Sequence, residues 1–195
     1  MLNSKFQDAF GLASQLHEVQ CRKGTKIPYI SHLMAVASLV LEASEYTEFQ
    51  SQRQDLAIAA LLHDALEDQG HKISLEKIER EFGSLVAQIV SDCSDDVITV
   101  KDQKKAPWRQ RKEKYIAHIG KTRKETQLVS CADKLHNFRS ILWDHARIGE
   151  KIWDRFNADR ADILWYYESL AQEFLSAWPE NPLASELNQT VKQLR

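Results

Sequence analysis

The stretch Asp55-Leu-Ala-Ile-Ala-Ala-Leu-Leu-His-Asp-Ala-Leu-Glu-Asp68 begins as an apolar run and ends in a cluster of polar side chains. Ala and Leu dominate it and no Gly or Pro interrupts it, which predicts one helix over residues 55–68. A helix this apolar is expected to be buried. The polar side chains at its end are His63, Asp64, Glu67 and Asp68. Such a cluster is costly to desolvate unless a cation neutralises it, although the solvated end of a helix would also explain it.

The rest of the chain shows the same helical spacing of apolar residues, and no segment alternates as a half-buried strand would. Helices are expected at residues 4–20, 29–41, 74–82, 85–90, 113–119, 126–142 and 153–178. Ser31 and Ser74 are the expected N-caps of two of them. We therefore predict an all-α fold, with a single domain over residues 1–178 followed by a turn and a short helix over residues 179–195.

Composition limits the classes of protein to consider. The chain has 195 residues, 43% of them apolar, which suffices for one domain with a substantial core. A net charge of −2 argues against nucleic acid as a partner. The absence of a signal peptide and of a membrane-length apolar run, together with three widely spaced cysteines, indicates a cytoplasmic protein with reduced thiols. The oligomeric state is open, because Trp178 and the last helix suit either an interface or a core cap.

Several polar residues interrupt the apolar faces of different expected helices. They are His32, His63, Asp64 and Asp133. Two imidazoles and two carboxylates, with positions left for water, suit Mn²⁺, Fe²⁺ or Zn²⁺. Each residue also has a structural interpretation. A histidine in a first helical turn is commonly a surface or capping residue, and Asp133 could pair with Lys134 or Arg139.

Basic residues are concentrated in two places, the loop of residues 21–28 and the segment Lys101–Lys112. A run of charges is usually a solvated surface, and this is the expectation for most of these side chains. The alternative is that they form an anion-binding lip opposite the acidic cluster.

The order His32, then His63-Asp64, then Asp133 resembles the HD superfamily of metal-dependent phosphohydrolases, which has an all-α fold. The chain is most similar to the hydrolase domain of RelA/SpoT-type alarmone enzymes and to the small stand-alone hydrolases of the Mesh1 type. The resemblance spans roughly residues 5–170. It rests on Arg22-Lys23…Pro28-Tyr-Ile-Ser-His32, Ala59-Ala-Leu-Leu-His-Asp-Ala-Leu-Glu-Asp68, Phe82-Gly83…Val86 and Ala132-Asp-Lys-Leu-His-Asn-Phe-Arg139.

This resemblance implies roles for individual residues. The metal ligands, usually for Mn²⁺, are His32, His63, Asp64 and Asp133. Glu67 and Asp68 match the pair that activates the attacking water. The positions that match nucleotide contacts are Arg22, Lys23, Lys134, Asn137 and Ser140. One departure from the family is Gln69, where a Thr commonly follows the Glu-Asp pair.

The implied reaction is hydrolysis of the 3′-pyrophosphate of guanosine tetra- or pentaphosphate, with release of pyrophosphate and GDP or GTP. Because the chain stops after the hydrolase region, we expect degradation without synthesis. Two alternatives stay open. One is a metal-dependent hydrolase of another nucleotide or phosphomonoester, such as an NADPH-like 2′-phosphate. The other is a nucleotide sensor without catalytic activity.

Overall fold

The computed structural model describes residues 1–94 and 106–194, so residues 101–105 of the basic segment lie outside the described part. Within the described part, every regular element is a helix, and the one β feature is an isolated bridge between Cys21 and Pro28. The predicted all-α fold is therefore confirmed. No helix among the described residues combines the length and the apolar character needed to cross a membrane. The chain divides into two compact units, residues 1–101 and 102–195.

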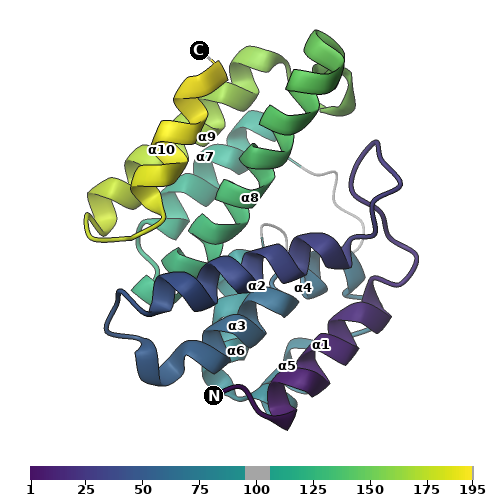
Figure 1. The fold of residues 1–195 in the computed structure, drawn as a ribbon, viewed down its shortest axis with the longest axis vertical. Helices are drawn as coiled ribbons and strands as arrows, with labels where there is room; N and C mark the ends of the chain where they lie inside the picture. The colour runs from purple at the N-terminus through teal and green to yellow at the C-terminus, as the bar shows by residue number, and fades with distance from the viewer. Residues whose placement is uncertain (95–105, 195) are drawn as a thin grey trace. The chain divides into compact units, whose positions relative to one another are not determined.

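The first unit is built around the apolar stretch of residues 56–62. Its helices are α1 (Ser4–Leu16), α2 (Ile30–Ser44), η1 (Gln50–Gln52), α3 (Arg53–Leu62), α4 (Ala65–Gln69), α5 (Leu75–Phe82) and α6 (Ser84–Cys93). Helix α3 packs against α1, α2 and α6 (Figure 1). Every residue from Leu56 to Leu62 is buried, which confirms that this helix belongs to the core.

The prediction of one continuous helix over residues 55–68 is wrong at its most polar point. Helix α3 ends at Leu62 and α4 begins at Ala65, so His63 and Asp64 lie between two helices. Asp64 has φ −95° and ψ 0°, a sparsely populated backbone conformation that is common at active sites. Helix propensity missed this break because Ala and Leu flank the two polar residues on both sides.

The two predicted N-caps have different outcomes. Ser74 caps α5, because its side chain accepts a hydrogen bond from the backbone N–H of Lys77. Ser31 does not cap α2, which already begins at Ile30 without a side-chain cap. The N–H groups of Ser31 and His32 donate instead to the carbonyls of Pro28 and Tyr29, so the first turn needs no capping side chain.

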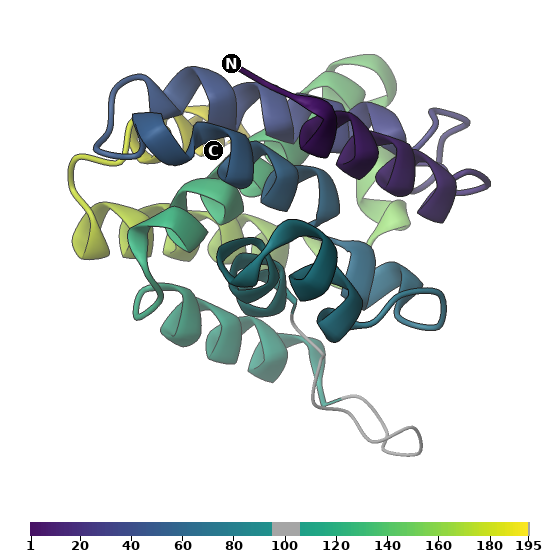
Figure 2. The same ribbon diagram turned by 90° about the horizontal axis from the view of Figure 1, so that it is seen from below.

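The second unit contains α7 (Trp108–Ile119), α8 (Lys124–Ile148), η2 (Gly149–Arg155), α9 (Arg160–Ala177), α10 (Ala184–Val191) and η3 (Lys192–Leu194). Helices α9 and α10 lie side by side, and both pack on α8 (Figure 1 and Figure 2). The aromatic stripe of α9 belongs to the core as predicted, with Tyr167 and Phe174 buried. Trp178 and Leu187 are also buried, so the C-terminal segment covers the core of this unit.

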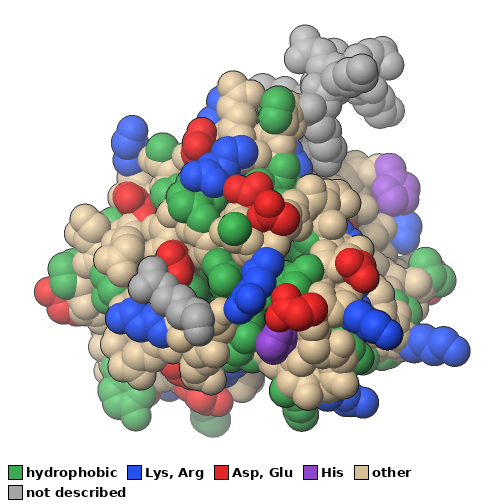
Figure 3. All heavy atoms as spheres, turned by 90° about the horizontal axis from the view of Figure 1, so that it is seen from above, with side chains coloured by type: hydrophobic (Ala, Val, Ile, Leu, Met, Phe, Trp, Pro, Cys, Tyr) green, Lys and Arg blue, Asp and Glu red, His purple; other side chains and the backbone are tan. Residues whose placement is uncertain are grey.

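Charged side chains of both signs are interspersed on the face drawn in Figure 3, which fits the small net charge. In the described part of the basic segment, Arg109 forms ion pairs with Glu113 and Asp162. Its guanidinium also stacks on the ring of Trp165, with the carbon atom 3.1 Å from the ring centroid. Arg109 therefore supports the packing of α7 on α9, a role that the sequence did not predict for this segment.

The cysteines offer a direct test of this core. Cys131 is fully buried in α8 and burial raises the pKa of its thiol, whereas Cys21 is exposed. Because the thiolate is the reactive form, iodoacetamide at neutral pH should label Cys21 in the native protein and leave Cys131 unmodified. Peptide mass spectrometry would measure both, with urea-unfolded protein as the control in which Cys131 reacts. Labelling of Cys131 at the rate of Cys21 in native protein would contradict the packing of α8.

Candidate metal centre

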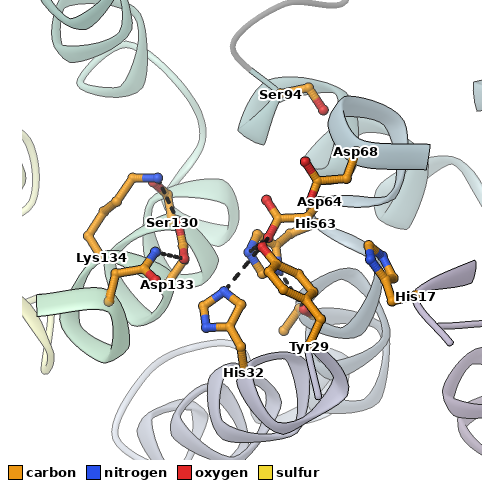
Figure 4. A network of polar contacts seen from close by, with 12 residues as sticks. His17, Tyr29, His32, His63, Asp64, Asp68, Ser94, Ser130, Asp133 and Lys134 are labelled. Carbon is orange, nitrogen blue, oxygen red and sulfur yellow. Dashed lines mark hydrogen bonds and ion pairs between the residues drawn. The ribbon is translucent and has the colours of Figure 1, made fainter. Parts of the chain in front are cut away.

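Three of the predicted ligands meet in the first unit. His32 comes from the first turn of α2, and His63 and Asp64 come from the break between α3 and α4. The Nε2 atoms of His32 and His63 lie 3.7 and 3.0 Å from the same oxygen, Oδ2 of Asp64. The two imidazole rings meet edge to face, with centroids 5.3 Å apart (Figure 4). The predicted convergence of these three side chains is thus present.

The hydrogen bonding of His63 decides what this cluster can hold. Its Nδ1 lies 2.8 Å from the backbone carbonyl oxygen of Ala60, which can only accept, so Nδ1 carries a proton. Nε2 lies 3.0 Å from the carboxylate of Asp64, so this contact is favourable when Nε2 carries a second proton, which makes an imidazolium–carboxylate pair, or when a metal cation lies beside both atoms. A buried imidazole with Nδ1 bonded to a carbonyl is also the usual state of a metal-binding histidine, so these residues fit a divalent ion.

Tyr29 adds a contact that the sequence did not indicate. Its hydroxyl donates to Asp64 Oδ2 at 2.5 Å, and its ring packs against His32 with centroids 5.4 Å apart. The only sequence signal is that Tyr29 precedes His32 by three residues, which places both on one side of a helical turn. Ligating carboxylates are commonly held by such outer hydrogen bonds.

A short hairpin positions Tyr29 and the predicted substrate residue Arg22. Cys21 and Pro28 form a β-bridge, and the Arg22 N–H donates to the Ile27 carbonyl at 2.8 Å. The guanidinium of Arg22 lies 5.8 Å from the centroid of the Tyr29 ring, while Lys23 is exposed. The structure therefore brings Arg22 to the edge of the histidine cluster, where a cation can attract an anionic ligand.

The proposed catalytic pair lies on α4, one turn beyond the candidate metal ligands His63 and Asp64. Glu67 and Asp68 are both exposed. Desolvation of its carboxyl group and the nearby charge of Asp64 raise the pKa of Asp68, while a hydrogen bond from Gln20 acts in the opposite direction. Glu67 and Asp68 belong to this separate short helix and not, as predicted, to one helix that is continuous through His63 and Asp64.

The other predicted residues lie in the second unit, on α8. Asp133 is buried; Lys134 Nζ donates to its Oδ2 at 2.6 Å and Asn137 Nδ2 donates to its Oδ1 at 2.5 Å (Figure 4). The pairing with Lys134 is the structural alternative that the sequence offered for Asp133. Each carboxylate oxygen has a second lone pair, so these bonds orient Asp133 without excluding a metal. The Ser140 hydroxyl donates to the His136 carbonyl of its own helix.

Comparison with known proteins places this arrangement in a family. A family model described as an HD domain matches residues 9–164, which spans both units. The chain belongs to the HD-domain family. A guanosine-3′,5′-bis(diphosphate) 3′-pyrophosphohydrolase, MESH1, of Xenopus tropicalis is 33% identical to this HD-domain chain, covering 73% of it and 76% of the relative. The human protein of the same description is 30% identical, with the same coverage.

Solved structures agree on the fold. A metazoan ortholog of SpoT, described as hydrolysing ppGpp, superposes with a TM-score of 0.74 at 22% identity, covering 100% of this chain and 97% of that one. A Listeria monocytogenes protein superposes with a TM-score of 0.66 at 24% identity, and the match covers 84% of this chain and 97% of the Listeria chain. At these identities the likeness shows the HD-type fold.

The contact between Tyr29 and Asp64 leads to a prediction about metal affinity. Tyr29→Phe removes the hydroxyl that donates to Asp64, so Mn²⁺ should bind about 10- to 100-fold more weakly. Isothermal titration calorimetry would measure the dissociation constant. Tyr46→Phe is the matched control, because Tyr46 is 80% exposed and in the first unit as well. Equal affinities of wild type and Tyr29→Phe would show that this hydroxyl does not support the site.

Proposed function

We propose that this protein is a metal-dependent hydrolase that removes the 3′-pyrophosphate from guanosine tetra- and pentaphosphate. The observation that carries the proposal is the convergence of two imidazoles, those of His32 and His63, on one carboxylate oxygen of Asp64. The activity named for relatives that are 30–33% identical over most of this chain supports the substrate.

In this proposal Asp133 of α8 supplies the fourth ligand of the same ion. His32, His63 and Asp133 are all buried and all of types that bind divalent metals. The HD-domain model matches residues 9–164, a range that contains all three residues, which supports giving them the same role. Two imidazoles and two carboxylates favour Mn²⁺, with Fe²⁺ or Zn²⁺ as the alternatives.

The chain's own residues account for the remaining chemistry. A bound divalent ion lowers the pKa of water and neutralises phosphoryl oxygens. Glu67 and Asp68, on the helix that follows the ligands, take the proton of the attacking water. Arg22 and Lys23 of the hairpin bind phosphate oxygens of the nucleotide, and they attract a highly anionic substrate that the net charge of −2 would otherwise repel.

On α8 the proposal gives Lys134 and Asn137 a double role. Both donate to Asp133 and so orient a metal ligand. Lys134 has further donors with which to contact phosphate, and Asn137 and Ser140 line the nucleotide site beside it. Because the ammonium group also lies 5.0 Å from the centroid of the Tyr115 ring, its position is set from two sides.

The activity has a direct test. Metal-stripped protein is incubated with the guanosine 3′-diphosphate alarmone, with and without Mn²⁺, and the products are separated by chromatography. We expect Mn²⁺-dependent release of pyrophosphate and GDP. His63→Ala should abolish it by removing a ligand, and Glu67→Gln should lower kcat roughly 10²- to 10⁴-fold by removing a proton acceptor.

Glu79→Gln is the matched control, because Glu79 is exposed on α5. A wild-type protein that binds Mn²⁺ but leaves the alarmone intact would contradict the substrate assignment. A panel of other nucleotides, including one with a 2′-phosphate, would then identify the substrate. No turnover of any of them would favour the sensor over the enzyme.

A further inference from the structure

The side chain of Gln20 contacts the proposed catalytic pair. Gln20 lies between α1 and the hairpin, and its Nε2 donates to Oδ2 of Asp68 at 2.7 Å. The two residues are 48 positions apart in the chain. Asp68 is exposed and its carboxylate would rotate easily, so a hydrogen bond to one oxygen fixes the direction of the other.

The orientation of the Gln20 amide is itself determined by its surroundings. Its Oε1 accepts from Gln69 Nε2 at 2.8 Å and lies 2.7 Å from His17 Nδ1. An amide oxygen can only accept, so His17 donates through Nδ1. The reversed amide would place its oxygen against the carboxylate of Asp68, which can only accept when ionised, and hydrogen-bond networks select the amide orientation in this way. The N–H groups of Gln20 therefore point to Asp68.

This network is rigid enough to act as a support. His17 and Gln69 are buried, with 2% and 8% of their surfaces exposed. The ring of His17 stacks on that of Tyr29, with centroids 5.1 Å apart. The Gln20 carbonyl accepts from the Tyr29 N–H at 2.9 Å. Gln20 and Tyr29 are thus joined at the base of the hairpin. From there, Tyr29 donates to Asp64 and Gln20 donates to Asp68.

We propose that Gln20, locked by His17 and Gln69, is a positioning residue that orients the Asp68 carboxylate toward the attacking water. The inference rests on the proposed hydrolase function. It also gives Gln69 a role, because the residue directly after the Glu-Asp pair supplies the hydrogen bond that fixes Gln20.

The test is Gln20→Met, which keeps the length of the side chain and removes both the donor to Asp68 and the oxygen that accepts from His17 and Gln69. We expect kcat for the alarmone to fall roughly 10- to 100-fold, with KM and Mn²⁺ affinity unchanged, because the Asp68 carboxylate is no longer oriented. In an Asp68→Ala background the same substitution should have no further effect, since Gln20 acts through Asp68. Gln88→Met is the matched control, because Gln88 also donates to a carboxylate, that of Asp92, at 2.7 Å on the exposed surface of α6.

The outcomes separate this inference from the proposed function. The role of Gln20 would be overturned if Gln20→Met and Gln88→Met turned over the alarmone at the same rate. It would also be overturned if Gln20→Met caused the same loss of activity in the wild-type and Asp68→Ala backgrounds. Either result would leave the proposed function standing. No turnover by the wild type would overturn the function. In that case the side-chain ¹⁵N resonance of Gln20 tests the hydrogen bond to Asp68 independently of activity. We expect this resonance to shift in Asp68→Ala, and an unchanged resonance would show that the hydrogen bond is absent.

Discussion

The structure of the site depends on the contact between a buried imidazole and a carboxylate. The Nδ1 atom of His63 donates to the Ala60 carbonyl, and its Nε2 faces the carboxylate of Asp64 at 3.0 Å. Because the imidazole is buried, this contact is costly unless positive charge, from a proton on Nε2 or from a metal ion, lies between the two groups. If His63 and Asp64 served only for packing, apolar residues at these positions would give a more stable fold. The break between α3 and α4 is explained in the same way, because it directs both side chains to one place.

Around this centre, the hairpin of residues 21–28 organises the polar contacts of the first unit. Its base joins Gln20 to Tyr29, and these two residues donate to Asp68 and Asp64 respectively. Arg22 extends from the same hairpin beside the Tyr29 ring. One short loop therefore orients a proposed metal ligand and a proposed proton acceptor, and it also carries the cation that we propose for substrate binding. In the second unit, Lys134 and Asn137 orient Asp133 comparably from within one helix.

Much of this could be predicted from the sequence, for identifiable reasons. Apolar periodicity gave the helices and their buried faces, and imidazoles and carboxylates on those faces gave the candidate ligands. The helix break at His63 and Asp64 could not be predicted, because Ala and Leu on both sides favour helix regardless of tertiary demands. Tyr29 and Gln20 were missed because their importance comes from contacts with residues 35 and 48 positions away, which no local pattern encodes. The domain limits expected at residue 178, the joint metal site with Asp133 and the contacts of Lys23 and Ser140 with substrate stay predictions.

The central proposal is that Asp133 is a ligand of the divalent ion. Calorimetric titration of metal-stripped protein with Mn²⁺ tests it most directly, on the wild type and on Asp133→Asn, with Asp154→Asn as a control on an exposed carboxylate of the second unit. The account predicts one ion per chain, and binding weakened by more than about 10-fold in Asp133→Asn alone, since losing a ligand costs at least as much as losing its hydrogen-bond partner. Equal affinity in all three proteins would contradict the proposal that Asp133 is a metal ligand.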